Sequence, residues 1–319
     1  MTFRQFLAVV ELRTKLVSLS TFTLAALYAR RGTGGWDLPS LAVCYAAVLC
    51  VDMGTTAFNS YFDWWRGTDE STLNRESDKV LVHEGVSALA TLLIALALFA
   101  AAGILGLLLA ARLGWWILAL GVPSLAAGFL YSGGPFPISR TPFGELFAGG
   151  FLGSVLFLVV YGVATTGGFT GGASAGSAAA RGGAPDFSGA LLASLPGSLM
   201  IAAILAVNNA CDIEGDRRSG RKTLAVLLGA KGGEAVAWIL VSAGFALSVA
   251  LGLLGTLPVS VAVAVPIVAV PATAELRAMG RRGYSHSTKG PNMGGILRVF
   301  LLWSAATGIC LAADILFRP

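Results

Sequence analysis

Two polar clusters with matching spacing interrupt a chain that is otherwise mostly apolar. In each cluster an asparagine stands four residues before an aspartate, a spacing that places both side chains on one face of an α-helix. Ionisable side chains at membrane depth are costly, so they are candidates for function by default. The first cluster contains Asn59, Asp63 and Asp69, and the second contains Asn208, Asn209, Asp212 and Asp216.

The side chains in and around these clusters suit the binding of a diphosphate through a metal ion. Carboxylate oxygens suit Mg²⁺, which binds through one or two carboxylates together with substrate phosphates. Basic residues that could balance the remaining phosphate charge follow each cluster: Arg66, Arg75 and Lys79 after the first, and Arg217, Arg218, Arg221 and Lys222 after the second. An apolar interior beside such a clamp could hold an isoprenoid tail, so the expected substrate is a prenyl diphosphate.

The composition indicates what kind of structure must position these side chains. Of the 319 residues, 55% are hydrophobic and only 12% are charged, and the mean hydropathy is +0.76. Soluble domains carry about 25% charged residues. We therefore expect an all-α fold, a polytopic membrane helical bundle. The net charge of +5 is explained by basic residues in the membrane loops, so no nucleic-acid partner is expected.

Nine apolar segments come close to the length of about 20 residues that a helix needs to cross a bilayer. They lie near residues 16–28, 38–61, 86–111, 113–131, 146–166, 190–210, 235–254, 257–273 and 296–312. Only Arg112, Leu113 and Gly114 separate the third segment from the fourth, which predicts a tight helical hairpin. We expect a single domain over residues 1–319, in which the Gly-, Ala- and Ser-rich residues 167–188 form a flexible external loop.

The basic residues are distributed unevenly between the two faces that these spans define. If the N-terminus is cytoplasmic, seventeen of the 22 lysines and arginines fall on the cytoplasmic side and five on the other. Cytoplasmic loops of membrane proteins carry an excess of Lys and Arg. We therefore expect an integral protein of a prokaryotic plasma membrane, surrounded by lipids, with its N-terminus and both aspartate clusters on the cytoplasmic face.

Three stretches of the sequence together resemble the UbiA superfamily of intramembrane aromatic prenyltransferases. The first is Asn59-Ser-Tyr-Phe-Asp63-Trp-Trp-Arg-Gly67-Thr-Asp69 and the second is Leu130-Tyr131-Ser132-Gly133-Gly134-Pro135. The third, which is the most specific, runs from Asn208-Asn209-Ala-Cys-Asp212 through Asp216 and Lys222-Thr223 to Gly229. Within the superfamily, these stretches are most similar to those of the 1,4-dihydroxy-2-naphthoate prenyltransferases of the menaquinone pathway.

This resemblance implies a UbiA-type bundle and Mg²⁺-dependent transfer of a polyprenyl group from a prenyl diphosphate to an aromatic acceptor, with 1,4-dihydroxy-2-naphthoate as the expected acceptor. It implies that the catalytic and Mg²⁺-binding residues are Asp63, Asp69, Asp212 and Asp216. It implies that substrate is bound by Asn59, Arg66, Arg75, Lys79, Tyr131, Arg140, Asn208, Asn209, Arg217 and Lys222. Many family members carry a lysine four residues after the tyrosine. Pro135 stands there in this chain, and Arg140 is the candidate replacement.

The chemistry implied by the resemblance has two stages. The allylic C–O bond of the prenyl diphosphate ionises, and an electron-rich naphthoate ring then attacks the allylic cation. In the family, the ring carbon that gains the prenyl chain loses its carboxylate as CO₂. Arg and Lys side chains would stabilise the negative charge that grows on the departing diphosphate.

Several alternatives stay open. The acceptor could instead be 1,4-dihydroxy-6-naphthoate, 4-hydroxybenzoate, homogentisate, a chlorophyllide, a haem precursor or a lipid, and a membrane transporter is the alternative from another class. A transporter is expected to bury its charges near the bilayer midplane, whereas both clusters here lie at one face.

Glu145, at the start of the fifth span, suits the positive end of a helix dipole as well as catalysis. Asp52, inside the second span, is expected to have a buried partner.

Overall fold

The computed structural model describes residues 1–33, 36–67, 80–170 and 185–317, and these residues form helices, with no strand among them. The first half contains α1 (Phe3–Val9), η1 (Leu12–Lys15), α2 (Leu16–Thr33), α3 (Leu38–Trp65), α4 (Val80–His83), α5 (Ala88–Leu113), α6 (Trp116–Ser132), η2 (Ile138–Arg140), α7 (Gly144–Ala148), η3 (Gly149–Val155) and α8 (Leu156–Thr170). The second half contains α10 (Phe187–Cys211), α11 (Ile213–Arg218), α12 (Leu224–Leu253), α13 (Val259–Arg282), η4 (His286–Thr288) and α14 (Lys289–Phe317).

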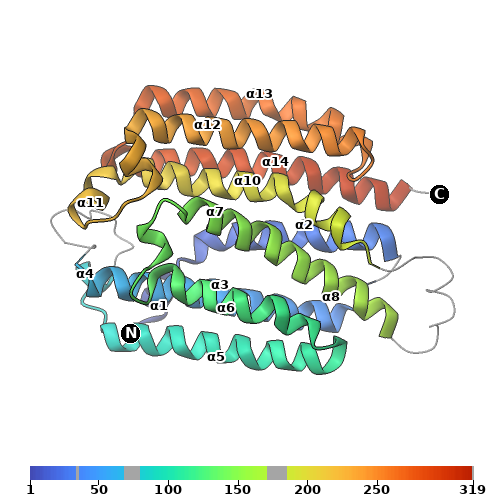
Figure 1. The fold of residues 1–319 in the computed structure, drawn as a ribbon, viewed down its shortest axis with the longest axis horizontal. Helices are drawn as coiled ribbons and strands as arrows, with labels where there is room; N and C mark the ends of the chain where they lie inside the picture. The colour runs from blue at the N-terminus through green and yellow to red at the C-terminus, as the bar shows by residue number, and fades with distance from the viewer. Residues whose placement is uncertain (34–35, 68–79, 171–184, 318–319) are drawn as a thin grey trace.

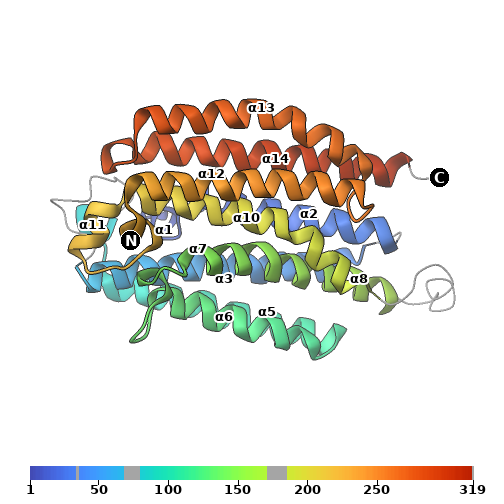
Figure 2. The same ribbon diagram turned by 45° about the horizontal axis from the view of Figure 1, so that its top comes forward.

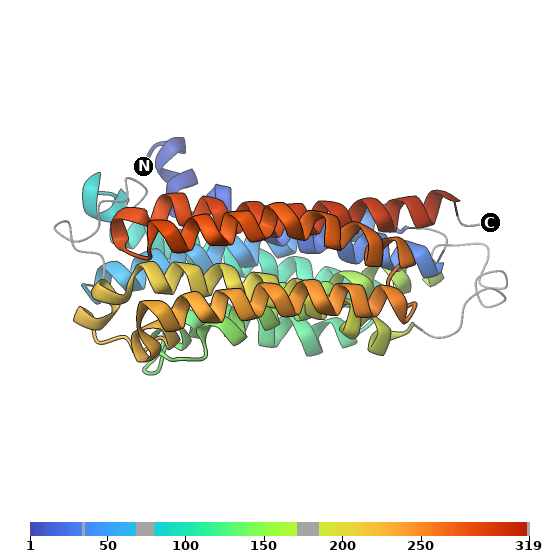
Figure 3. The same ribbon diagram turned by 90° about the horizontal axis from the view of Figure 1, so that it is seen from above.

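The long helices run side by side along the longest axis of the molecule (Figure 1). In the described part of the chain, seven helices are long and apolar enough to cross a membrane, and α6 is a shorter apolar helix. Helix α2 lies alongside them in all three views (Figures 2 and 3). The predicted all-α membrane bundle is therefore confirmed. The count of nine spans stays a prediction.

Polar side chains at the helix starts explain where several spans begin. The carboxylate of Asp37 accepts a hydrogen bond from the backbone N–H of Ser40 at the start of α3, and Asp186 accepts one from Gly189 at the start of α10. These oxygens satisfy N–H groups that have no partner inside the helix.

Between α5 and α6, Gly114 adopts φ 111°, a left-handed conformation that favours glycine. The predicted tight hairpin forms at this residue.

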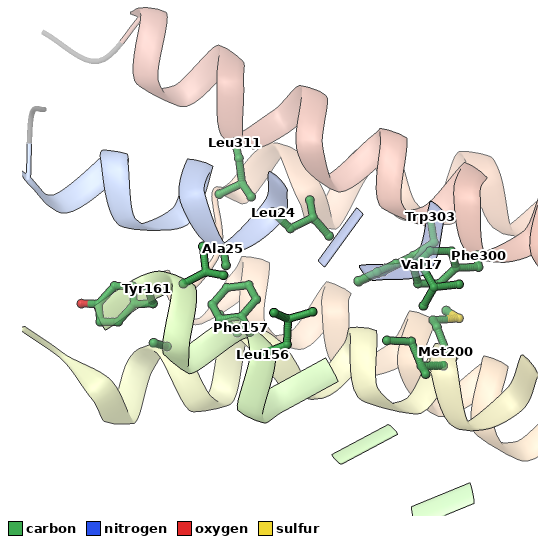
Figure 4. Packing of buried hydrophobic residues seen from close by; sticks show 14 of the residues in the cluster. Val17, Leu24, Ala25, Leu156, Phe157, Tyr161, Met200, Phe300, Trp303 and Leu311 are labelled. Carbon is green, nitrogen blue, oxygen red and sulfur yellow. The ribbon is translucent and has the colours of Figure 1, made fainter. Parts of the chain in front are cut away.

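The core between α2, α8, α10 and α14 is built from large apolar side chains. Leu24 of α2, Phe157 of α8, Met200 of α10 and Trp303 of α14 are buried there (Figure 4). In a membrane, lipid tails are as apolar as these side chains, so close van der Waals packing between the helices supplies the stabilisation. This apolar interior holds the helices around the polar end that is described below.

Asp52, whose role the sequence left open, has a buried cation as its partner. The Nζ atom of Lys15 lies 2.7 Å from Asp52 Oδ1, and both side chains are largely buried. Lys15 also donates to the hydroxyl of Thr56, and the hydroxyl of Ser18 donates to the second oxygen of Asp52 at 2.6 Å. The expectation of a buried partner is confirmed, and the pair joins the end of η1 to the middle of α3.

The short elements gather at one end of the bundle. Helices α4 and α11 and the N-terminus lie at this end in Figure 1, and the C-terminus lies at the other.

Helix α8 reaches Thr170 and α10 begins at Phe187, so the described residues include only the edges of the expected external loop. Residues 171–184 lie outside the described part, and the loop and the single domain stay predictions.

Candidate active site

The first polar cluster lies at the end of α3. Asn59 Nδ2 donates a hydrogen bond to Asp63 Oδ2 at 3.1 Å, so the two side chains share a helix face as their spacing predicts. The hydroxyl of Ser132, at the end of α6, donates to Asn59 Oδ1 at 2.8 Å. Asp63 is buried. The carboxylate is therefore held in a fixed position between α3 and α6.

The second cluster surrounds the break between α10 and α11. Asp212 lies between the two helices, and Asp216, on α11, is only 3% exposed. The hydroxyl of Thr223 donates to Asp216 Oδ2 at 3.2 Å. On the last turns of α10, Asn208 is partly buried and Asn209 is buried.

Arg221 brings the two clusters together. Its guanidinium forms ion pairs with Asp63 and with Asp216, the latter at 3.4 Å between Nη1 and Oδ1. Burial alone would lower the pKa of Arg221, but the carboxylates of Asp63 and Asp216 outweigh it and raise the pKa above its usual range. Arg221 is therefore charged, and it occupies the centre of the site.

Negative charge accumulates around Asp216. The pKa of Asp216 is raised to about 6, first by burial and then by the nearby carboxylates of Asp212 and Asp63. The Arg221 guanidinium and the hydrogen bond from Thr223 act in the opposite direction. A divalent cation would relieve this repulsion between carboxylates.

The donor set suits Mg²⁺. Among the described residues, no group of three or more His, Cys, Asp and Glu side chains is close enough together to hold a metal ion. Mg²⁺ does not require such a cage, because it keeps several waters and binds through one or two carboxylates plus substrate phosphates. Asp63, Asp212 and Asp216 offer oxygen ligands of this kind.

The segment from His286 to Lys289, between α13 and the start of α14, contacts Asp212. This contact could not be read from the sequence. Lys289 Nζ lies 2.7 Å from Asp212 Oδ2, and His286 Nδ1 lies 3.7 Å from Asp212 Oδ1. The sequence presents Lys289 only as part of a basic loop, and it shows no metal-binding spacing around His286. A polar run between two spans, from Ser285 to Lys289, is the signal that could have indicated a site segment.

Three arginines converge beside Asp63. Arg66 donates to the backbone carbonyls of Ser132 and of Gly134, the latter at 3.0 Å. The pKa of Arg66 is lowered, first by burial and then by the neighbouring charges of Arg140 and Arg221, while Asp63 opposes them. Arg140 is therefore close to this centre. It is held there because it donates to the Ser219 carbonyl, and its own carbonyl accepts from the Lys222 N–H at 2.9 Å.

The remaining predicted residues fall into three groups. Tyr131, at the end of α6, lies within electrostatic range of Arg221, Glu145, Asp63 and Asp216. Arg217 and Lys222 have exposed side chains, and neither forms an ion pair with any residue that the structure describes. Asp69, Arg75 and Lys79 lie outside the described residues, so their roles stay predictions.

Glu145 is buried and is hydrogen-bonded to a residue of the second cluster. It lies in the first turn of α7, but its side chain is only 6% exposed. Asn209 Nδ2 donates to Glu145 Oε1 at 2.9 Å, which ties α7 to the second cluster. The sequence alone does not decide whether Glu145 caps its helix or takes part in catalysis. The hydrogen bond from Asn209 places Glu145 at the site.

The model of the UbiA prenyltransferase family matches residues 18–304. A 1,4-dihydroxy-2-naphthoate octaprenyltransferase of Bacillus subtilis is 34% identical over 212 residues, which cover 66% of this chain and 61% of that protein. A Mycobacterium tuberculosis protein of the same name is 32% identical over 65% of this chain and 65% of its own length. The matched stretch thus spans under two thirds of either relative.

Two solved structures have the same fold. A UbiA homologue from Aeropyrum pernix, solved in its apo form, superposes with a TM-score of 0.64 at 23% identity, covering 95% of this chain and 97% of its own. A UbiA homologue from Archaeoglobus fulgidus, solved with GPP and Mg²⁺, gives a TM-score of 0.63 at 15% identity, covering 97% and 99%. These similarities establish the fold. Together with the family match over most of its length, they show that this chain belongs to the UbiA prenyltransferase family.

Proposed function

We propose that this protein transfers a polyprenyl group from a prenyl diphosphate to 1,4-dihydroxy-2-naphthoate, and that it uses Mg²⁺. The observation that carries the proposal is the position of Arg221, between Asp63 of one cluster and Asp216 of the other. A single centre that combines carboxylates with converging arginines suits a diphosphate and its metal ion.

An unpaired donor supports the binding of an anion at this centre. The Nε atom of Arg221 is buried and has no hydrogen-bond acceptor among the described residues. Buried donors without a partner are costly, so a ligand that supplies acceptor oxygens would bind favourably. A diphosphate carries such oxygens and also the negative charge that the cluster of Arg66, Arg140 and Arg221 attracts.

The comparisons support the substrate classes. Relatives that are 34% and 32% identical to this chain over the aligned stretch are named 1,4-dihydroxy-2-naphthoate octaprenyltransferases. The Archaeoglobus fulgidus homologue was solved with GPP and Mg²⁺. By analogy, Asp63, Asp212 and Asp216 would hold Mg²⁺ here, with Asp69 as a further candidate from the sequence.

The residues at the centre suit a reaction that begins with departure of the diphosphate. Mg²⁺ bound between carboxylate and phosphate oxygens would offset the diphosphate charge and make it a better leaving group. Arg221, Arg66 and Arg140 would donate hydrogen bonds to the oxygens on which negative charge grows. Lys289 is placed to join them, because it already lies against Asp212.

The surroundings of the site agree with a substrate that resides in the membrane. The polar clusters lie at the end of the bundle that carries α4, α11 and the N-terminus (Figure 1). We propose that this end is cytoplasmic, in a prokaryotic plasma membrane, as the distribution of basic residues indicates. The prenyl tail would then extend from the site between the apolar helices toward the lipid.

Incubation of the purified protein with Mg²⁺, a labelled prenyl diphosphate and a panel of aromatic acids tests the proposal. We expect mass analysis to detect prenylated, decarboxylated product from 1,4-dihydroxy-2-naphthoate in preference to 1,4-dihydroxy-6-naphthoate, 4-hydroxybenzoate or homogentisate. A prenyl diphosphate should also raise the unfolding temperature only when metal is present, because a ligand stabilises the state that binds it. Full turnover in excess chelator, or no product from any aromatic acid, would overturn the proposal.

A further inference from the structure

A second unpaired polar atom lies at this site, and its chemistry is opposite to that of Arg221 Nε. Glu145 Oε2 is buried and has no hydrogen-bond donor among the described residues, while Oε1 accepts from Asn209. A buried carboxylate oxygen without a donor costs free energy. The site therefore favours a ligand that brings a hydrogen-bond donor to this oxygen.

Close packing between two helices fixes the position of Glu145. A Cβ atom on Gly149 would collide with the backbone carbonyl of Ser198 on α10, and one on Gly153 would collide with the Ser198 side chain. The absence of these Cβ atoms lets η3 pack closely against α10. Glu145 precedes this segment by one turn, so the same contact holds its carboxylate against Asn209.

The stretch that follows Glu145 has an unusual backbone. Residues 149–155 form a π-helix, a conformation that is rare and is frequent at functional sites. Ser154 on this segment is hydrogen-bonded to Ser194 and Ser198 of α10, both at 2.8 Å. The contact between η3 and α10 is thus fixed by side-chain hydrogen bonds as well as by the glycines.

The unpaired oxygen distinguishes between the two substrates. A prenyl diphosphate carries only acceptor oxygens and negative charge, so it would be repelled by Glu145. An aromatic acceptor with a hydroxyl group brings the missing donor. Tyr131 lies within electrostatic range of Glu145 and of Asp63, Asp216 and Arg221, so Glu145 lies near the proposed diphosphate centre.

We propose that Glu145 binds the ring hydroxyl of the aromatic acceptor through Oε2 and takes up its proton when the new C–C bond forms. This inference rests on the proposed function and names the residue that recognises the acceptor. Asn209, through its hydrogen bond to Oε1, is a positioning residue for this carboxylate.

Protons and electron pairs balance over the whole reaction. The C–O bond to the diphosphate breaks and its electron pair leaves with the diphosphate. The ring carbon that carries the carboxylate forms a bond to the allylic carbon, while the neighbouring hydroxyl becomes a carbonyl and its proton moves to Glu145. Loss of CO₂ returns the electron pair of the C–C bond to that oxygen, which regains the proton from Glu145. Glu145 ends as a carboxylate, and no oxidant or reductant is consumed.

Glu145→Gln tests the inference, because it keeps the size of the side chain and removes the proton acceptor. We expect its kcat to fall by about 10²–10⁴, the range for loss of a general base. The rise in unfolding temperature caused by geranyl diphosphate and Mg²⁺ should stay as in the wild type, which shows that folding and the diphosphate centre are intact. Glu234→Gln, which changes a partly buried carboxylate on α12, is the matched control and should retain wild-type turnover.

An acceptor analogue provides a readout that a structural role would not change. When the hydroxyl next to the carboxylate is replaced by a methoxy group, the wild type should bind the analogue at least about tenfold more weakly than 1,4-dihydroxy-2-naphthoate, since Glu145 loses its donor. In Glu145→Gln this discrimination should largely disappear. Binding is measured by tryptophan fluorescence in the presence of a non-reactive thiodiphosphate analogue.

The possible outcomes separate this inference from the proposed function. If the wild type prenylates the acceptor and Glu145→Gln does so with unchanged kcat and unchanged acceptor affinity, only the role of Glu145 is overturned. Loss of the geranyl diphosphate response in Glu145→Gln would also overturn it, since the residue would then serve the diphosphate centre or the fold. If the wild type transfers no prenyl group to any aromatic acid, both proposals fail.

Discussion

The guanidinium of Arg221, in the loop after α11, forms an ion pair with the carboxylate of Asp63, which lies 158 positions earlier in the chain at the end of α3. The same guanidinium contacts Asp216. One cation therefore links two clusters that come from different spans. This relationship is what would let both clusters serve the single diphosphate that we propose as the substrate.

The central position of Arg221 predicts a large effect when it is removed. Arg221→Ala leaves Asp63 and Asp216 buried without their cation, and breaking a buried ion pair costs about 3–5 kcal/mol. We expect a clear fall in unfolding temperature in detergent, together with weaker stabilisation by a prenyl diphosphate and Mg²⁺. Both are measured by thermal unfolding with and without ligand.

Arg218→Ala is the control for this change. Arg218 pairs with Glu214 one turn away, and both side chains are mostly exposed, so the pair is worth about 0.3–0.5 kcal/mol. The variant should unfold near the wild-type temperature and keep its response to ligand. If the unfolding temperature and the stabilisation by ligand fell equally in the two variants, Arg221 would not be at the centre of the site.

Asparagine substitutions in the two clusters should show that they serve one ligand. Asp63→Asn and Asp212→Asn should each reduce turnover by far more than tenfold, because each weakens metal binding and the balance of charge around the diphosphate. The double variant should lose much less than the product of the two single losses, as residues that act as a unit are non-additive. Fully multiplicative losses in steady-state assays would indicate separate roles.

Much of the architecture follows from local patterns in the sequence. Apolar runs near the length of a bilayer span predict the long helices, and the spacing of Asn59 and Asp63 predicts the hydrogen bond that the structure has between them. Gly114 between two apolar runs predicts the hairpin. These features depend on residues close together in the chain, so periodicity and length reveal them.

Contacts between distant segments could not be predicted in the same way. The sequence offers Arg217, Arg218, Arg221 and Lys222 as equivalent cations, and only the path of the loop after α11 turns Arg221 inward while Arg217 stays exposed. The same holds for Lys289, whose partner Asp212 is 77 positions away. A loop whose basic residues also suit the positive-inside rule carries no local sign of such a contact.

Lys289 should compete with a metal ion for Asp212. Its ammonium lies 2.7 Å from the carboxylate, and a unit charge about 4 Å away changes an interaction energy by about 1 kcal/mol even in water. In the absence of diphosphate, Lys289→Ala should therefore bind Mg²⁺ roughly fivefold more tightly or better. Titration of the unfolding temperature with Mg²⁺ measures this, with Lys231→Ala, an exposed lysine on α12, as the control. Unchanged or weaker metal binding would contradict this role.

The proposed orientation can be tested by labelling single cysteines. All four native cysteines are free, so they can be replaced before new ones are introduced. Ser285→Cys, an exposed position between α13 and α14, should react with a membrane-impermeant maleimide only from the cytoplasmic side of sealed vesicles. Ser177→Cys, in the expected external loop, should react only from the other side. Reaction of both positions from the same side would contradict the nine-span topology.

The buried pair of Lys15 and Asp52 should stabilise the fold without being part of the reaction centre. Asp52→Asn leaves the ammonium of Lys15 buried and uncompensated, and we expect a loss of about 3–5 kcal/mol in the free energy of unfolding. Replacing both residues, as Lys15→Met with Asp52→Leu, removes both charges and should cost much less than the sum of the single changes. Reversible chemical unfolding in detergent measures Asp52→Asn, the double variant and its two single changes, Lys15→Met and Asp52→Leu. If the single and double changes were additive, the 2.7 Å contact between Lys15 and Asp52 would contribute no coupling between η1 and α3.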